Sequence, residues 1–160
     1  MSEPKHVPPR CEFEQDKLVM KLDEVVSSDV VGIIDETAAK VMAVIERTGC
    51  WDDIENIDLA LREALANAII HGSVSDPAKS ARICVALHKD CDMLIVVKDA
   101  GSGFDPSQLP NPVMGQSLLS THGKGIYLIN LLMEDVRFTF SQGTSIYMRR
   151  TAAPKPLDTN

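Results

Sequence analysis

A change of hydrophobic period constrains the fold of this chain more than any other feature. Residues 29–48 and 53–71 carry apolar side chains at helical spacing, and the β-rich runs 80–88 and 93–98 follow them. Five apolar residues form the expected inner stripe of the first helix: Val30, Ile33, Ile34, Val41 and Ile45. The pattern therefore predicts two successive helices and then a β-hairpin.

Capping and turn residues give the expected ends of these elements. The candidate N-caps are Ser27, Ser28 or Asp29 for the first helix and Asp52 or Asp53 for the second. A glycine follows each helix, as Gly49 and Gly72. Alternation over 12–26 predicts a first strand, and a short helix at 123–133 precedes a closing hairpin of 136–141 and 144–149. Helices gathered on one face of a mixed, mostly antiparallel sheet give an α+β fold, a two-layer sandwich.

The composition is that of one folded domain. With 44% hydrophobic and 24% charged residues, the chain is not disordered along its whole length. The net charge of -7 disfavours nucleic acid as a partner, because binding to a phosphate backbone needs clustered positive charge. No apolar run approaches the roughly 20 residues of a membrane span, and the start lacks the apolar core of a signal peptide. We expect a cytoplasmic protein with one domain over 12–150 between flexible ends at 1–11 and 151–160.

The four cysteines have no spacing typical of a disulfide framework. Because Cys11, Cys50, Cys84 and Cys91 follow no such pattern, reduced thiols are expected. Cys84, His88 and Cys91 have a spacing that resembles a metal site, but they offer three ligands where structural zinc needs four. Strand residues and a turn thiol are the favoured interpretation.

The segment LREALANAIIHG, Leu61–Gly72, carries polar residues at helical spacing. Glu63 and Asn67 are four residues apart and share one helix face, with His71 one turn further on. Their neighbours are apolar, and a buried amide is costly unless it is hydrogen-bonded. An ordinary solvated stripe is the alternative, and this segment taken alone favours it.

A second polar segment, VVKDAGSGFDP, follows a predicted strand. Asp99 enters a turn whose Gly101 and Gly103 lack Cβ atoms, so a flat ligand could lie against the backbone. A dinucleotide fingerprint fails, because Pro106 stands where its third glycine belongs. An aspartate that only caps the turn is the alternative. The proline-bearing residues 106–122 are expected to form a mobile loop.

The last two segments are rich in glycine. Gly123, Lys124 and Gly125 stand where a helix is expected to begin, and backbone N–H groups at such a terminus bind phosphate. The spacing is not that of a P-loop, and a glycine hinge is the alternative. Gly143 and Thr144 precede the last strand, where they could serve only the hairpin.

Taken in this order, the segments have a specific resemblance. The chain resembles the GHKL ATPases, the superfamily of gyrase, chaperone, histidine-kinase and mismatch-repair ATPases. The wording LREALANAIIHG and GKGIYLINLLMEDV resembles the RsbW-like branch, the anti-sigma-factor serine protein kinases, and the likeness covers about residues 12–150. It implies the histidine-kinase-like ATP-binding fold, with ATP between the helices and the sheet and a lid at about 106–122.

The resemblance also implies roles for single residues. Asp99 would accept a hydrogen bond from the adenine amino group, Asn67 would coordinate Mg²⁺, and Glu63 would act on the attacking hydroxyl. The other residues implied to bind the nucleotide are Gly101, Gly103 and Thr144 near the adenine and Gly123, Lys124 and Gly125 around the phosphates. It gives His71 no role.

The function implied is that of an ATP-dependent serine protein kinase and anti-sigma factor in a partner-switching module. It would phosphorylate a serine of a small STAS-type anti-anti-sigma protein, sequester an RNA polymerase sigma factor and form a homodimer, with no direct nucleic acid or membrane partner. The alternative is a nucleotide-gated binding module that sequesters a partner without phosphoryl transfer. Glu63 favours the kinase, because a pure binder would not need a carboxylate there. A detached histidine-kinase domain and a ligand-free scaffold rank below these two.

Overall fold

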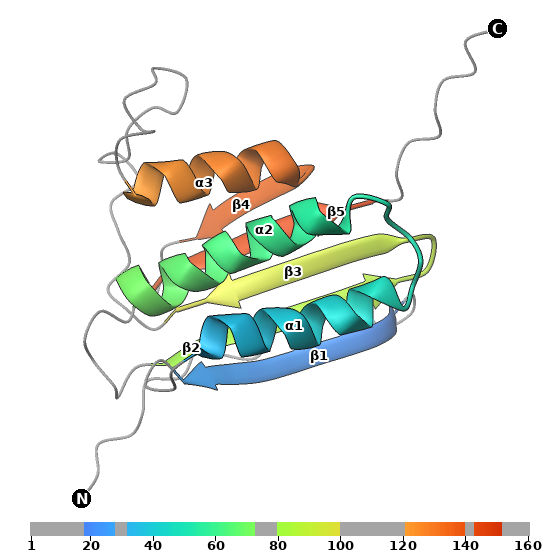
Figure 1. Cartoon of the computed structure of the whole chain (residues 1–160), viewed down its shortest axis with the longest axis horizontal. Helices are drawn as coiled ribbons and strands as arrows, with labels where there is room; N and C mark the ends of the chain where they lie inside the picture. The colour runs from blue at the N-terminus through green and yellow to red at the C-terminus, as the bar shows by residue number, and fades with distance from the viewer. Residues whose placement is uncertain (1–17, 28–31, 73–79, 100–120, 140–142, 152–160) are drawn as a thin grey trace, which may run out of the picture.

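A computed structural model describes residues 18–27, 32–72, 80–99, 121–139 and 143–151 of the chain. In these ranges a single layer of helices covers one face of a five-stranded sheet (Figure 1). This arrangement confirms the predicted α+β two-layer sandwich.

The sheet is antiparallel at each pairing between described strands. Its strand order is β1-β2-β3-β5-β4. The strands are β1 (Leu18–Ser27), β2 (Ser80–His88), β3 (Asp92–Lys98), β4 (Asp135–Thr139) and β5 (Ser145–Arg150). Both predicted hairpins are confirmed, β2 with β3 and β4 with β5. The sheet was expected to be mixed, but the described part contains no parallel pair.

The helical layer consists of α1 (Ile33–Glu46), α2 (Ile54–Ala66) with its π-helical extension η1 (Asn67–Gly72), and α3 (Thr121–Leu132). The N-cap of α2 is Asp53, one of the two predicted capping residues. The first helix differs from the prediction, because its N-cap is Gly32, whose φ of 75° is left-handed, and no side chain caps it. Ser27 precedes the helix by several residues, and residues 28 and 29 lie outside the described ranges.

The core lies between the helices and the sheet, on the stripes that the hydrophobic period predicted. Its largest side chains with no more than 1% exposure are aliphatic or methionine: Val41, Ile45, Ile57, Leu61, Leu65, Ile83, Met93, Ile95, Ile129 and Met148. Burying a side chain of this size contributes about 2 kcal/mol to folding. The core therefore fixes α2 and α3, which carry the candidate site residues, against β3 and β5.

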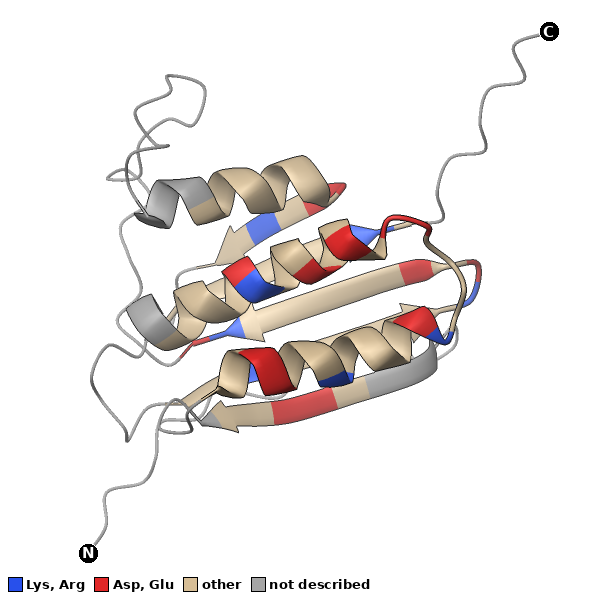
Figure 2. Ribbon diagram, in the orientation of Figure 1, with Lys and Arg blue, Asp and Glu red and all other residues tan. Residues whose placement is uncertain are grey.

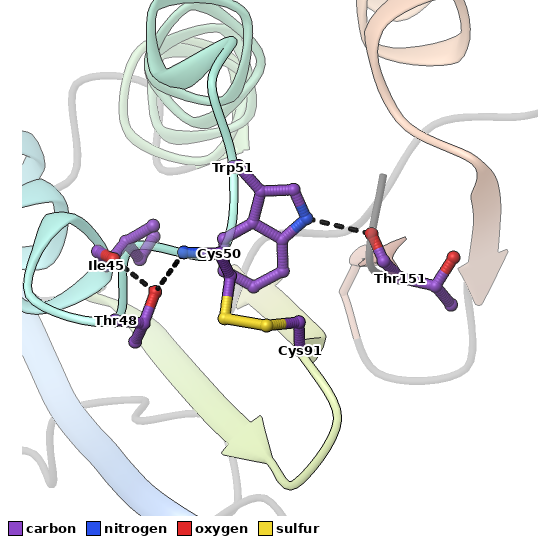
Figure 3. The surroundings of a disulfide bond; sticks show 6 residues. All are labelled: Ile45, Thr48, Cys50, Trp51, Cys91 and Thr151. Atoms are coloured by element: carbon purple, nitrogen blue, oxygen red, sulfur yellow. Dashed lines mark hydrogen bonds between the residues drawn. A yellow bond between two sulfur atoms is a disulfide. The ribbon is translucent and has the colours of Figure 1, made fainter. Parts of the chain in front are cut away.

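Cys50 and Cys91 form a disulfide, so the prediction of reduced thiols is wrong for this pair (Figure 3). Cys50 follows α1, and Cys91 lies in the turn between β2 and β3 with a left-handed φ of 59°. The neighbouring Trp51 is buried, and its indole N–H donates to the backbone oxygen of Thr151 at 2.8 Å. The disulfide thus joins the helical layer to the sheet at the end where β3 begins.

Charged side chains are spread over the visible face of the helices. Figure 2 shows acidic residues on both α1 and α2, with fewer basic ones between them. Arg62 on α2 pairs with Asp58 on the same helix and with Asp35 on α1, and these bonds raise the pKa of Arg62. Within the described ranges, no helix has both the length and the apolar character needed to cross a membrane.

Candidate functional site

The described candidate residues gather at one end of the molecule. The C-terminal end of α2, the start of α3, the end of β3 and the start of β5 all lie at this end (Figure 1). The disulfide lies at the opposite end. The fold therefore places the polar segments that are far apart in the sequence at one edge of the helix–sheet sandwich.

Glu63 and Asn67 come from the last turn of α2 and the first residue of η1. Asn67 is only 7% exposed, and its side-chain nitrogen Nδ2 has no hydrogen-bond partner within the described part of the chain. Glu63 is half-buried on the same face. A buried amide without a partner is costly, and a bound ligand would remove that cost. The solvated-stripe interpretation is therefore wrong for Asn67.

The π-helical η1 starts at Asn67 itself. A π-turn widens the helix by one residue per hydrogen bond, and such turns are frequent at functional sites. The predicted helix does run to Gly72, but its last turn has this wider geometry. The side chain of His71 lies outside the described set, so its role stays open.

Gly125 brings α3 to the same two side chains. A Cβ atom built on Gly125 would lie 2.9 Å from Glu63 Oε2 and 3.6 Å from each amide atom of Asn67. The prediction that Gly123, Lys124 and Gly125 form a turn before the helix is wrong, because α3 already begins at Thr121. The side-chain placement of Lys124 is outside the described set.

Asp99 and Thr144 form the second part of the site, at the edge of β3 and β5. The backbone N–H of Asp99 donates to the carbonyl oxygen of Thr144 at 2.9 Å, and the N–H of Thr144 donates to Asp99 Oδ1 at 3.2 Å. Asp99 is 6% and Thr144 2% exposed, and Thr144 Oγ1 has no hydrogen-bond partner among the described residues. A carboxylate and an unpaired hydroxyl thus lie together in a buried position.

Gly143 is a site residue that the sequence indicated only as a hairpin turn. Its φ is +87°, and a Cβ there would lie 2.2 Å from the backbone oxygen of Asp99. Only glycine therefore permits this contact between the two strands. The signal was present as the Gly-Thr pair, but the sequence did not show that it faces Asp99.

The described residues fit a nucleotide with a hard metal ion better than they fit zinc. The unpaired buried atoms Asn67 Nδ2 and Thr144 Oγ1 are oxygen-and-amide chemistry, which suits phosphate, base and Mg²⁺ contacts. No group of three or more metal-ligating side chains occurs in the described ranges, and Cys91 of the zinc-like spacing is held in a disulfide. The predicted Gly101, Gly103 and residues 106–120 lie outside the described ranges.

Comparisons with known proteins agree with this geometry. The family model for the histidine kinase-like ATPase domain matches residues 32–150. A serine-protein kinase RsbW from Bacillus cereus is 32% identical over 142 residues, which cover 84% of this chain and 84% of that protein. The RsbW protein of Bacillus thuringiensis subsp. konkukian has the same identity over the same length and coverage.

Two solved structures share the fold. One contains the RsbU and RsbW domains of Rv1364c from Mycobacterium tuberculosis, with a TM-score of 0.60, 18% identity, and coverage of 85% of this chain and 34% of that chain. The other is the SiaB–SiaC complex from Pseudomonas aeruginosa, with a TM-score of 0.60, 10% identity, and coverage of 85% and 91%. The chain belongs to the histidine kinase-like ATPase domain family and is a relative of the RsbW serine-protein kinases.

Proposed function

We propose that this chain is an ATP-dependent protein serine kinase that phosphorylates a small STAS-type anti-anti-sigma protein and sequesters a sigma factor. The observation that carries the proposal is the pair Glu63 and Asn67. Both side chains lie at the open end of α2, and the Asn67 amide is buried with an unpaired nitrogen. The RsbW relatives are serine-protein kinases by name, which supports the same activity here.

Asp99 and Thr144 are proposed to hold the adenine. The two residues are joined by two hydrogen bonds, so the carboxylate has a fixed position at the sheet edge. Asp99 would accept a hydrogen bond from the exocyclic amino group of the base, and the Thr144 hydroxyl would gain the partner it lacks. Gly101 and Gly103 are proposed to leave room for the ring.

Asn67 is proposed to bind the metal and the phosphates. Its amide offers one oxygen as a hard ligand and N–H groups as donors to phosphate oxygens. Mg²⁺ bound with ATP would neutralise phosphate charge during transfer. Gly123, Lys124 and Gly125 are proposed to bind the phosphates from the start of α3, with residues 106–122 as the lid. Thr121 and His122 of that range belong to α3.

Glu63 is proposed to be the general base. It lies one helical turn before Asn67, so its carboxylate is close to the phosphates that Asn67 would bind. The carboxylate takes the proton of the serine hydroxyl as that oxygen bonds to the γ-phosphorus. The bond from the γ-phosphorus to the bridging oxygen breaks, and ADP leaves with both electrons.

The proposed domain organisation is a single kinase domain over 12–150, acting as a homodimer in the cytoplasm. The acidic net charge of -7 suits a chain that controls transcription through protein partners instead of binding DNA. The second candidate is a nucleotide-gated module that sequesters its partner unmodified. The position of Glu63 beside Asn67 favours the kinase.

The test compares wild type, Glu63→Gln and Asn67→Ala in lysate of the source organism with labelled Mg·ATP. Glu55→Gln is the matched control, because Glu55 is an exposed carboxylate on the same helix. We expect Glu63→Gln to lower serine phosphorylation of a small partner about 10²–10⁴-fold with unchanged Mg·ATP affinity. Asn67→Ala should weaken Mg·ATP binding, and Glu55→Gln should behave as wild type.

Two results would contradict the proposal in different ways. Equal transfer by wild type and Glu63→Gln would remove Glu63 as the base. A partner held by both proteins in an ATP-dependent way, with no new phosphate on its serines, would identify the sequestering module instead.

A further inference from the structure

Gly125 is in direct contact with the proposed catalytic carboxylate. A Cβ atom on Gly125 would lie 2.9 Å from Glu63 Oε2, which is closer than real Cβ contacts allow. Gly125 is buried near the start of α3, and the neighbouring Ile126 and Ile129 are buried as well. The Glu63 carboxylate thus extends into space that any other residue at position 125 would fill.

Glycine is an unfavourable residue inside a helix, so its presence here calls for a local reason. Alanine has the higher helix propensity and is small enough for most helix–helix contacts. At Gly125, no backbone atom is among the three nearest to the hypothetical Cβ; all three belong to the side chains of Glu63 and Asn67. The missing side chain therefore makes room for two polar groups of α2 and not for a closer approach of the helix backbones.

We propose that Gly125 is a positioning residue: it lacks a side chain so that the Glu63 carboxylate can lie between α2 and α3 at the place where it meets the serine hydroxyl. This inference rests on the proposed function of Glu63. It assigns Gly125 a task different from binding phosphate through its backbone, and the two tasks have different kinetic consequences.

The two contacts predict which step a Gly125→Ala substitution affects. Glu63 Oε2 is the far end of a flexible side chain, so the carboxylate moves aside while the helices stay in place. Both amide atoms of Asn67 are 3.6 Å from the hypothetical Cβ, an ordinary van der Waals distance, so the metal ligand stays where it is. A displacement of about 1 Å at a reacting group can lower the rate about 100-fold. We expect kcat to fall by about that factor, with little change in KM for Mg·ATP.

The kinetic test compares Gly125→Ala with wild type, Glu63→Asp and the double variant. Aspartate has one methylene fewer, so its carboxylate no longer reaches the space beside position 125. Gly125→Ala should therefore cause no further loss of kcat in the Glu63→Asp background. Leu131→Ala, at an exposed position on α3, is the control and should keep wild-type kinetics.

A thermal-unfolding cycle tests the contact itself without any kinase assay. Alanine at position 125 should raise the melting temperature in the Glu63→Ala background, because helix propensity improves and the space is free. The gain should be smaller with Glu63 present. Equal gains in the two backgrounds would show that no contact exists and would overturn the inference.

The kinetic outcomes separate this inference from the proposed function. A wild-type chain that transfers no phosphate contradicts the proposed function, while the thermal cycle still decides whether the contact exists. If wild type transfers phosphate and Gly125→Ala has the same kcat, the positioning role is wrong. A raised KM for Mg·ATP with unchanged kcat would also overturn it and would assign Gly125 to phosphate binding.

Discussion

Reduction of the Cys50–Cys91 disulfide should destabilise the chain without removing its nucleotide site. The two cysteines are 41 residues apart in the sequence. Closing a loop of this length removes unfolded-state entropy worth about 4 kcal/mol at 25 °C in the chain-entropy treatment. For a domain of this size, such a loss lowers the melting temperature by about 10 °C. Mg·ATP affinity well below that temperature should not change, because the disulfide lies at the opposite end of the sheet from Asp99 (Figure 1).

The assay is thermal unfolding with and without reductant, with Trp51 as the local probe. Trp51 is the single tryptophan of the chain, and it adjoins the disulfide (Figure 3). Because a disulfide quenches indole emission, fluorescence should rise on reduction before any unfolding. The control is the variant with both Cys50 and Cys91 changed to serine, which reports the effect of reductant on the rest of the chain.

The loop-closure argument fails on a specific result. Thiol labelling would first establish that both cysteines are reduced. If the melting temperature then falls by less than about 3 °C beyond the fall in the double-serine variant, the entropy estimate of about 4 kcal/mol is wrong. A loss of Mg·ATP affinity in the folded, reduced protein would show that the two ends of the sheet are coupled.

Two further predictions concern pH and Gly143. Burial raises the pKa of Asp53, but hydrogen bonds from Arg150 and Asn56 and the charge of Arg150 bring it below its ordinary value of 3.8. This stabilisation is complete above a pH of about 4 and is lost as the pH falls through the folded-state pKa. Asp53→Asn should flatten the acid side of the unfolding free energy against pH, and an unchanged curve would count against the Arg150 pairing. Gly143→Ala should lower the free energy of unfolding by about 1–3 kcal/mol from backbone strain and more from its clash with Asp99. Gly49→Ala, with a φ of +65° and no atom within 4 Å, isolates the strain, so equal losses would contradict the clash.

The sequence predicted those elements whose signals are local. The hairpin of β2 and β3 follows from two β-rich runs joined by a short turn, and both strands lie where they were expected. Asp53 caps α2, and Gly72 ends its π-helical extension, as the capping rules predict. The pairing of Glu63 with Asn67 also required only the helical period. What could be predicted thus depended on residues at most one or two turns apart.

The features that were missed depend on contacts between distant segments. Nothing in the spacing of Cys50 and Cys91 shows that the end of α1 meets the turn after β2, since only the folded sheet brings them together. The start of α3 was placed too late because glycine is a poor helix former. The observed helix includes Gly125, whose lack of a side chain leaves room for Glu63. Tertiary packing overrides local propensity at both places.

The two ends of α2 have complementary tasks. At its N-terminus, Arg150 of β5 donates to both carboxylate oxygens of Asp53, at 2.7 and 2.9 Å, and to the carbonyl oxygen of Leu132 at 3.0 Å. One guanidinium thus ties the start of α2 to the end of α3 and to the sheet. At the other end of α2, Asn67 is buried with an unpaired amide nitrogen, a cost that packing elsewhere must offset. A functional group holds its position only when its supporting elements are rigid. The clamp formed by Arg150 therefore allows polar, incompletely paired side chains to stay in place where the nucleotide is proposed to bind.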